Sequence, residues 1–234
     1  MRQSYLDTAP MEGILIKYSE DIYFSQKKIK QLTEKNKNLE IEILKRLSLA
    51  AKFKDTDTGF HVLRVGLTAQ LIAERYGMNK EFTLNIYHAA QMHDVGKIAI
   101  VDSVLKKTEH FTLEDRIEME FHTVAGYNIL TGSGISLLDF AAEIALCHHE
   151  RFDGKGYPQK LKGTEIPISA RIVALADFFD ALTMDRVYRK AMSDQDAFNL
   201  ITAGKGSHFD KDVVEAFLGV SGDIIKIRND FNQQ

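Results

Sequence analysis

Cysteine is almost absent from this chain of 234 residues: Cys147 stands alone, so no internal disulfide can form. A single free cysteine suits a reducing compartment. The chain also lacks an uninterrupted apolar run of about 18 residues, so we expect no membrane-spanning helix. The N-terminus does not resemble a signal peptide, because Asp7 and Glu12 precede any apolar segment. These absences predict a cytoplasmic protein with no membrane association.

The chain has no excess of basic residues, and its formal net charge is −3 at pH 7. This balance argues against a nucleic-acid binder that uses a broad basic surface, but it leaves room for a small anion held by a local basic cluster. Proline is also scarce and occurs only at Pro10, Pro158 and Pro167. Helical spacing of apolar residues recurs along most of the chain, whereas strand-like alternation is rare. We therefore predict an all-α fold.

A long charged helix is predicted from about residue 22 to residue 46. Two series of positions recur there every seven residues: Ile22, Ile29, Asn36 and Ile43, and Ser25, Leu32, Leu39 and Arg46. This is the pattern of a short, imperfect coiled coil, in which a buried Asn36 would fix the register of a dimer. The pattern favours a homodimer joined through this helix; the alternative is a solvated connector helix that packs on its own domain.

The remainder of the chain is predicted to form a compact helical bundle. The expected helices run from Leu63 to near Gly77, over residues 82–95 with Gly96 as the stop, and over 113–130, 136–150 and 168–184, with one or two more around Phe198 and residues 213–217. Glycines and prolines predict a loop over residues 151–167. We divide the chain into an N-terminal segment with its connector helix (1–46), a catalytic domain (47–220) and a C-terminal tail (221–234).

Six of the eight histidines form a suggestive pattern, together with Asp94 and Asp177. His61 and His122 stand alone, His93 is followed by Asp94, His148 is followed by His149, and His88 lies near the second group. A lone helical histidine is more often a core or surface residue than a ligand. Histidines and carboxylates from several helices, however, are how helical bundles hold two-metal sites.

Asp177 lies within the apolar run of residues 172–179. A carboxylate buried there would be unfavourable unless it is paired or bound to a metal. The alternatives are a buried salt bridge and a position at the polar edge of the helix, and Asp180 and Asp185 are better candidates for those two roles. Lys97 follows Asp94 by three residues, so one helical turn would bring it beside the His93–Asp94 pair.

Two further features suit an anionic substrate. The loop that follows His149 contains Gly154, Gly156 and Tyr157, and we interpret it as a substrate-binding lip. Arg186, Arg189 and Lys190 follow the helix that carries Asp177. Arginine side chains match phosphate oxygens with two parallel hydrogen bonds.

Three motifs in combination carry a family resemblance: H-D-V-G-K at residues 93–97, H-H-E-R-F-D-G-K-G-Y-P at 148–158 and A-D-F-F-D-A-L-T at 176–183. The stretch from residue 47 to residue 218 resembles the HD-GYP subgroup of the HD phosphohydrolase superfamily. The resemblance implies an HD-domain helical bundle that hydrolyses cyclic di-GMP to pGpG, or further to GMP, by attack of a metal-activated hydroxide at phosphorus. The alternatives are an HD hydrolase of another nucleotide and a non-catalytic cyclic di-GMP receptor or interaction module.

The resemblance also implies roles for individual residues. The metal ligands would be His61, His93, Asp94, His122, His148, His149 and Asp177, and they would hold two divalent ions, iron or manganese, bridged by Asp94. The catalytic residues would be His93, Asp94 and Lys97, and the substrate would be bound by Lys97, Gly156, Tyr157, Arg186 and Arg189.

Asp57 and the N-terminal part of the sequence each admit two interpretations. Asp57 stands where some members carry a glutamate that ligates a third metal, and its side chain is shorter by about 1.5 Å. It either falls short, which leaves two ions, or completes a three-metal site. No sensory or receiver domain is visible before Ile22, so we expect either a stand-alone enzyme or the catalytic part of a protein with such a domain upstream.

Overall fold

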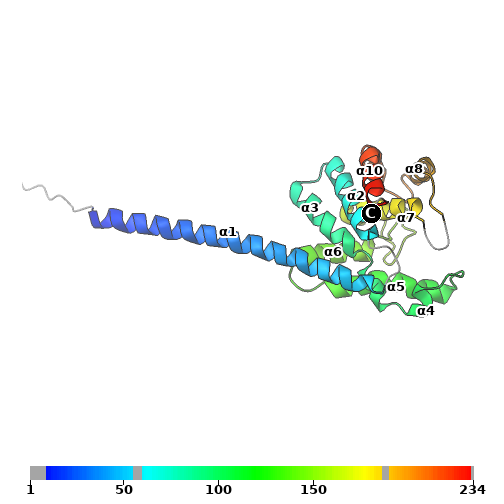
Figure 1. The fold of residues 1–234 in the computed structure, drawn as a ribbon, viewed down its shortest axis with the longest axis horizontal. Coiled ribbons are helices and arrows are strands. Elements are labelled where there is room, and N and C mark those ends of the chain that lie inside the picture. Colours follow the sequence, from blue (N-terminus) through cyan, green and yellow to red (C-terminus); the bar gives the residue numbers. More distant parts are fainter. Residues whose placement is uncertain (1–8, 55–59, 186–189, 233–234) are drawn as a thin grey trace, which may run out of the picture. The chain divides into compact units, whose positions relative to one another are not determined.

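The computed structural model describes residues 9–54, 60–185 and 190–232 (Figure 1). Within these ranges every regular secondary-structure element is a helix, and the only β-type pairing among the described residues is one isolated bridge between Lys205 and Phe209. The predicted all-α fold is confirmed. None of the described helices is both long enough and apolar enough to span a membrane. The chain divides into two units, residues 1–42 and 43–234.

Ten α-helices and three short 3-10 segments follow one another along the described residues. They are α1 (Ala9–Lys52), α2 (His61–Tyr76), α3 (Lys80–Ala89), η1 (Ala90–Met92), η2 (Val95–Ala99), α4 (Asp102–Leu105), α5 (Leu113–Leu130), α6 (Ser136–Cys147), η3 (Gly163–Glu165), α7 (Ile168–Thr183), α8 (Asp194–Ala203), α9 (Lys211–Leu218) and α10 (Ser221–Asn232).

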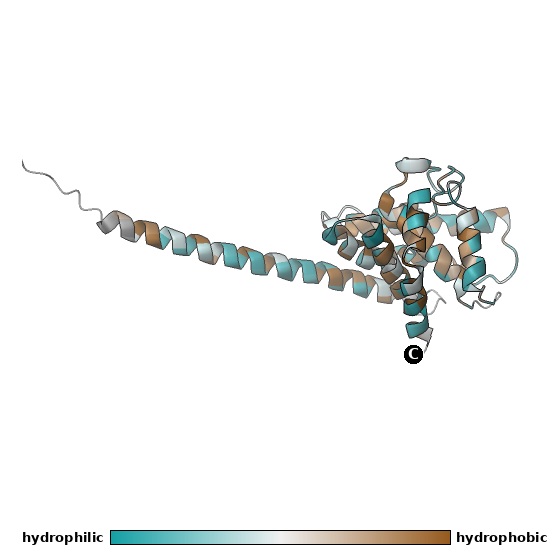
Figure 2. Ribbon diagram, turned by 90° about the horizontal axis from the view of Figure 1, so that it is seen from above, coloured by the Kyte–Doolittle hydropathy of each residue, from teal (hydrophilic) through white to brown (hydrophobic). Residues whose placement is uncertain are grey.

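Helix α1 forms the whole described part of the first unit, and it extends the predicted helix at both ends. No proline or glycine occurs between residues 14 and 52, so nothing in that stretch breaks the helix. Apolar and hydrophilic residues alternate in bands along it (Figure 2). The described side chains between residues 11 and 39 are all exposed, including Ile22, Ile29, Leu32 and Leu39 of the predicted coiled-coil series.

The second unit is built around α2 and α7, which pack against each other. Both helices are apolar on the faces that meet the core, where Val65 and Ile72 of α2 and Ile172 and Leu175 of α7 are fully buried. Helix α5 packs on α6 and on η2, and α2 also contacts α3, α9 and α10. As predicted, α2 ends near Gly77: its last residue is Tyr76, and Gly77 caps it with a φ of 96°, a left-handed conformation that favours glycine.

Two predicted helices end earlier than expected. The helix predicted over residues 82–95 ends at Ala89, and the chain then tightens into η1, a turn at His93–Asp94 and η2. Gly96 does not stop a helix, because it lies inside η2. The helix predicted over residues 136–150 ends at Cys147, so His148 and His149 begin the following loop. That loop is confirmed and includes only the short η3.

Candidate metal centre

Five separate parts of the second unit deliver side chains to one centre. Helix α2 supplies one histidine, the turn between η1 and η2 a His-Asp pair, α5 one histidine, the end of α6 the double histidine, and α7 one aspartate. The structure thereby brings together all seven predicted ligands: His61, His93, Asp94, His122, His148, His149 and Asp177. They form two groups, and within each group the candidate ligand atoms lie within 4.8 Å of one another.

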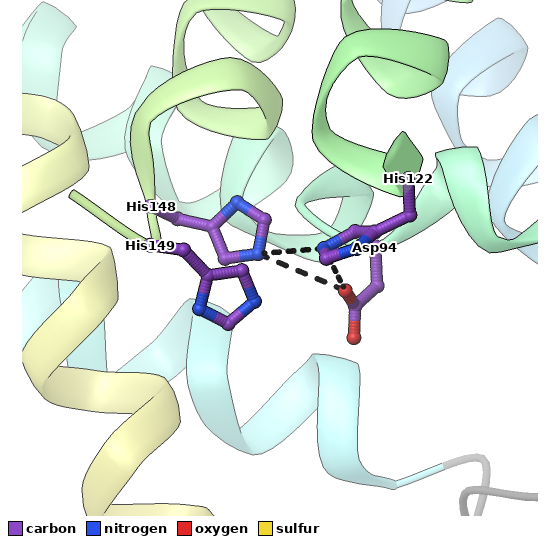
Figure 3. Close-up of side chains that lie close together, drawn as sticks. All are labelled: Asp94, His122, His148 and His149. Carbon is purple, nitrogen blue, oxygen red and sulfur yellow. Dashed lines mark hydrogen bonds and ion pairs between the residues drawn. The ribbon is translucent and has the colours of Figure 1, made fainter. Parts of the chain in front are cut away.

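The first group comprises Asp94, His122, His148 and His149 (Figure 3). The Oδ1 atom of Asp94 lies 3.3 Å from Nε2 of His122 and 3.7 Å from Nε2 of His148. The two imidazole Nε2 atoms are 3.4 Å apart. Three nitrogen or oxygen donors therefore point toward a common centre, and the ring of His149 lies beside that of His148, with centroids 4.0 Å apart.

The second group comprises His61, His93 and Asp177. The Oδ1 atom of Asp177 lies 3.4 Å from Nε2 of His61 and 3.7 Å from Nε2 of His93. Asp94 connects the two groups, because its Oδ2 atom lies 3.3 Å from Nε2 of His93 while its Oδ1 atom faces the first group. One carboxylate thus presents one oxygen to each group.

Three atoms of this centre are buried without a hydrogen-bond partner among the described residues: Nε2 of His61, Nε2 of His93 and Oδ1 of Asp94. Buried polar atoms are almost always satisfied, so such atoms call for a ligand. Imidazole nitrogens and carboxylate oxygens are the ligands of iron, manganese, zinc and related divalent metals. The residues therefore fit a divalent metal centre.

In three of the site histidines Nε2 faces the centre, and the other ring nitrogen, Nδ1, contacts a backbone carbonyl oxygen. Nδ1 of His93 lies 2.8 Å from the oxygen of Ala90, Nδ1 of His122 lies 2.6 Å from that of Met119, and Nδ1 of His148 lies 3.0 Å from that of Ala145. A carbonyl only accepts, so Nδ1 must carry the proton in each ring. In the neutral rings, the Nε2 lone pairs then face the centre, as metal binding requires.

Burial and neighbouring charges shift the pKa values of the side chains in the centre. Burial lowers the pKa of His93, but the carboxylates of Asp94 and Asp177 outweigh it and raise that pKa to about 9. Burial works against ionisation of Asp94, yet Lys97 and His93 hold the pKa of this carboxyl well below its usual range. Burial lowers the pKa of His122 to about 4 despite the nearby Asp94. Without a metal, the ionised carboxylate of Asp94 therefore lies between a protonated ring at His93 and a neutral ring at His122.

Lys97 lies at the edge of the centre, as predicted. Its Nζ atom is 2.7 Å from Oδ2 of Asp94, and its side chain keeps 19% of its surface exposed. A cation that contacts both the candidate bridging carboxylate and solvent is placed to meet an anion that enters from outside. The ring of Tyr157 stacks on that of His149, with centroids 4.8 Å apart.

The loop that carries Tyr157 is held by Glu150, which was not among the predicted site residues. The buried carboxylate of Glu150 accepts hydrogen bonds from the backbone N–H groups of Gln159 and Leu161, at 2.7 and 3.1 Å. Gly156 lies so close to the start of the loop that a Cβ atom there would be 2.4 Å from the Arg151 nitrogen. These contacts fold the loop back onto His149.

Asp180 and Arg64 complete the surroundings of His61. Asp180 was one of two carboxylates considered for a buried salt bridge or a polar helix edge, and it forms a buried salt bridge: Nε and Nη2 of Arg64 lie 2.6 and 2.9 Å from its two oxygens. Arg64 was not among the predicted site residues, although its spacing of three residues from His61 was a signal. Asp185, the other of these two carboxylates, is exposed.

Three predicted site residues lie outside the described residues: Asp57, Arg186 and Arg189. Lys190, the third member of that basic cluster, is described and exposed.

Comparison with known proteins identifies the family. Residues 28–213 match the family model described as HD domain. A "Cyclic di-GMP phosphodiesterase" of Thermotoga maritima is 38% identical over 226 residues, which cover 97% of this chain and 59% of that protein. A "3'3'-cGAMP-specific phosphodiesterase 2" of Vibrio cholerae is 40% identical over 187 residues, which cover 80% of this chain and 36% of that protein.

The fold also matches solved structures. A crystal structure of the V. cholerae cyclic GMP-AMP specific phosphodiesterase V-cGAP3 aligns with a TM-score of 0.58 at 19% identity, over 78% of this chain and 48% of that one. This chain spans 59% and 36% of the length of the two curated relatives named above. The match of the family model over most of the sequence confirms the predicted superfamily: the chain belongs to the HD domain family.

Proposed function

We propose that this chain is the catalytic region of a phosphodiesterase that hydrolyses cyclic di-GMP to pGpG. The observation that carries the proposal is the position of Asp94, which faces both candidate metal groups and contacts Lys97. Two adjacent metal groups with a cation beside them suit in-line displacement at a phosphodiester. The name of the T. maritima relative supports cyclic di-GMP as the substrate.

We propose that the seven converging residues hold two divalent ions, one in each group, with Asp94 shared between them. Iron or manganese suits these ligands, but the ligand set alone admits several divalent metals. When bound, the ions would supply Lewis acidity and lower the pKa of a water molecule at the site. Asp57, which would decide between two and three ions, stays a prediction.

The protein's own side chains have separate roles in this proposal. Lys97 binds an oxygen of the scissile phosphate and stabilises the negative charge that develops on it. Burial raises the pKa of Tyr157 above its usual value, so its hydroxyl stays protonated and donates a hydrogen bond to a phosphate oxygen. Gly156 allows the loop that bears Tyr157 to turn tightly against His149. We assign Arg186 and Arg189 to the remaining phosphate oxygens.

A second candidate substrate is 3'3'-cGAMP, because the V. cholerae relative that is 40% identical bears that name. The two nucleotides share the same phosphodiester ring and differ in one base. The described centre acts on the phosphate, so it accounts for hydrolysis of either substrate, and the base contacts decide between them.

The test is turnover by protein loaded anaerobically with Fe²⁺ or Mn²⁺. Cyclic di-GMP and 3'3'-cGAMP are supplied separately, and the products are separated by chromatography. We expect conversion of cyclic di-GMP to pGpG, with slower conversion of 3'3'-cGAMP. Faster conversion of 3'3'-cGAMP would favour the second candidate. Tight binding of cyclic di-GMP without turnover would contradict the proposal and favour a non-catalytic receptor.

We also propose that α1 joins two copies of the chain as a coiled coil. The predicted heptad series continues toward the N-terminus with Leu15 and Tyr18, and both side chains are exposed like those of Ile22 and Ile29. A helix whose apolar seam is exposed needs a partner to bury it. Sedimentation of the intact chain and of one cut before Lys52 tests this. Monomeric mass for both would contradict the dimer.

A further inference from the structure

His61 differs from the site histidines whose Nδ1 atoms donate to backbone carbonyls. Its Nδ1 atom lies 2.7 Å from Oδ2 of Asp180, so the partner of this ring is a carboxylate. A carbonyl oxygen carries only a partial charge, whereas a carboxylate carries a full one. A histidine bonded to a carboxylate has a more basic opposite nitrogen and a more firmly fixed ring, and so binds metal more tightly.

Arg64 determines the position of Asp180. The guanidinium occupies both carboxylate oxygens, and Oδ2 is shared between Arg64 and His61. All three side chains are buried. The Asp180 carboxylate is therefore held at both oxygens by the guanidinium, with one of those oxygens placed against Nδ1 of His61.

The spacing in two helices explains this arrangement. His61 and Arg64 are three residues apart on α2, and Asp177 and Asp180 are three residues apart on α7, so each pair shares one face of its helix. Because α2 and α7 pack together, the four side chains interleave. Asp177 lies next to Nε2 of His61, and Asp180 lies next to its Nδ1.

We infer that Asp180 and Arg64 are positioning residues that set the metal affinity of the group formed by His61, His93 and Asp177. The first group, with Asp94, His122, His148 and His149, has no described hydrogen bond to either residue, and its affinity is independent of them. This inference rests on the proposed two-metal centre. A buried ion pair is by itself a weak contributor to stability. The pair of Asp180 and Arg64 contacts the candidate ligand His61, so a role in metal binding explains its position better.

The test is binding of Mn²⁺ alone to the full chain, freed of metal and followed by equilibrium dialysis and electron paramagnetic resonance. The variant is Asp180→Asn, which keeps the shape of the side chain but removes its charge. We expect the wild type to bind two ions. The variant should retain one ion with unchanged affinity and bind the other about 10–100-fold more weakly, in line with losses of second-layer partners at other metal sites. In the electron paramagnetic resonance spectrum of the variant, the signal of two coupled Mn²⁺ ions should therefore be weaker than in the wild type at the same Mn²⁺ concentration.

The matched control is Asp210→Asn. Asp210 is also buried and paired with an arginine, Arg171, but it contacts none of the seven candidate ligands. We expect this variant to bind both ions as the wild type does. Arg64→Lys provides a second, milder variant: it keeps the charge, loses the two-point contact, and should weaken the same ion to a smaller extent.

Three results would overturn the inference. Asp180→Asn and Arg64→Lys could both bind two ions with wild-type affinity, which would show that the pair does not influence the metal. Asp210→Asn could lose the same ion, which would show a general effect of destabilisation. A wild-type chain that binds fewer than two ions would overturn the two-metal proposal together with this inference, so the two failures are distinguishable.

Discussion

Gly96 packs directly on the backbone of His122: a Cβ atom at Gly96 would lie 1.9 Å from the carbonyl oxygen of His122 and 2.4 Å from the nitrogen of Gly126. This contact joins η2 to α5. It thereby holds Asp94, which directly precedes η2, beside His122. The glycine of the H-D-V-G-K motif is therefore required by the close approach of two backbone segments.

Gly96→Ala should destabilise the protein by about 3 kcal/mol, because backbone atoms cannot move aside as flexible side chains do. The free energy of unfolding in urea measures the effect. Gly222→Ala is the matched control: Gly222 lies in α10 with no atom within 4 Å of an added Cβ, and the substitution should be neutral or stabilise by up to about 1 kcal/mol. Equal stability of the two variants would refute the role of Gly96.

Glu150→Gln should weaken the binding of cyclic di-GMP and leave the metal content unchanged. The amide offers one acceptor where the carboxylate offers two, so one of the N–H groups of Gln159 and Leu161 loses its partner, at a cost of about 1–3 kcal/mol. Calorimetric nucleotide binding and metal analysis on the same samples measure both. Glu165→Gln is the control, because it changes an exposed carboxylate of the same loop. A loss of metal in Glu150→Gln would show that the loop also supports the metal ligands.

Lys97→Gln should lower kcat for cyclic di-GMP by about 10²–10³-fold with both metals still bound, because the variant lacks the cation that stabilises the charge developing on phosphate. Steady-state kinetics with parallel metal analysis measure the effect. Lys106→Gln removes an exposed lysine that pairs with Asp102 and should leave kcat unchanged. An unchanged kcat in Lys97→Gln would remove Lys97 from the mechanism.

His208 should make the protein less stable as the pH falls. Burial and the nearby Arg151 lower its pKa to about 4, whereas in the unfolded chain the value is about 6.5. The unfolded chain therefore takes up the proton first. The stability contributed by the neutral ring is complete above about pH 6.5 and is lost as the pH falls toward about 4.

Denaturant unfolding at pH 7.5 and pH 5, with a chelator present throughout, measures this dependence. The wild type should lose more stability between the two pH values than His208→Gln, which cannot titrate. Equal losses in the two proteins would contradict the expected contribution of His208.

The sequence predicted the convergence of the seven candidate ligands better than it predicted their local structure. The motifs identified the residues, but apolar periodicity continues past Ala89, so the pattern indicated a helix through Val95. The close contact between Gly96 and α5 favours the tighter 3-10 conformation instead. Apolar periodicity indicates which face of a segment is buried, but it contains no information about such contacts between distant segments.

The partners of the ligands were harder to predict for a related reason. Asp180 was recognised as a candidate for a buried salt bridge, because a carboxylate in an apolar helix needs a partner. Its partners His61 and Arg64 lie more than a hundred residues away and meet it only through the packing of α2 on α7. Glu150 was missed because a loop carries no periodic pattern, and its hydrogen bonds to the backbone depend on the exact path of that loop.

The central claim is that Asp94 links two bound metals in a working phosphodiesterase centre. Mass spectrometry of metal content, combined with turnover of cyclic di-GMP, tests it on the wild type and on Asp94→Ala, both made in iron-rich medium and purified anaerobically. We predict two ions per chain and turnover in the wild type, and loss of bound metal and of turnover in Asp94→Ala. An Asp94→Ala protein that retains two ions and hydrolyses cyclic di-GMP would contradict the account.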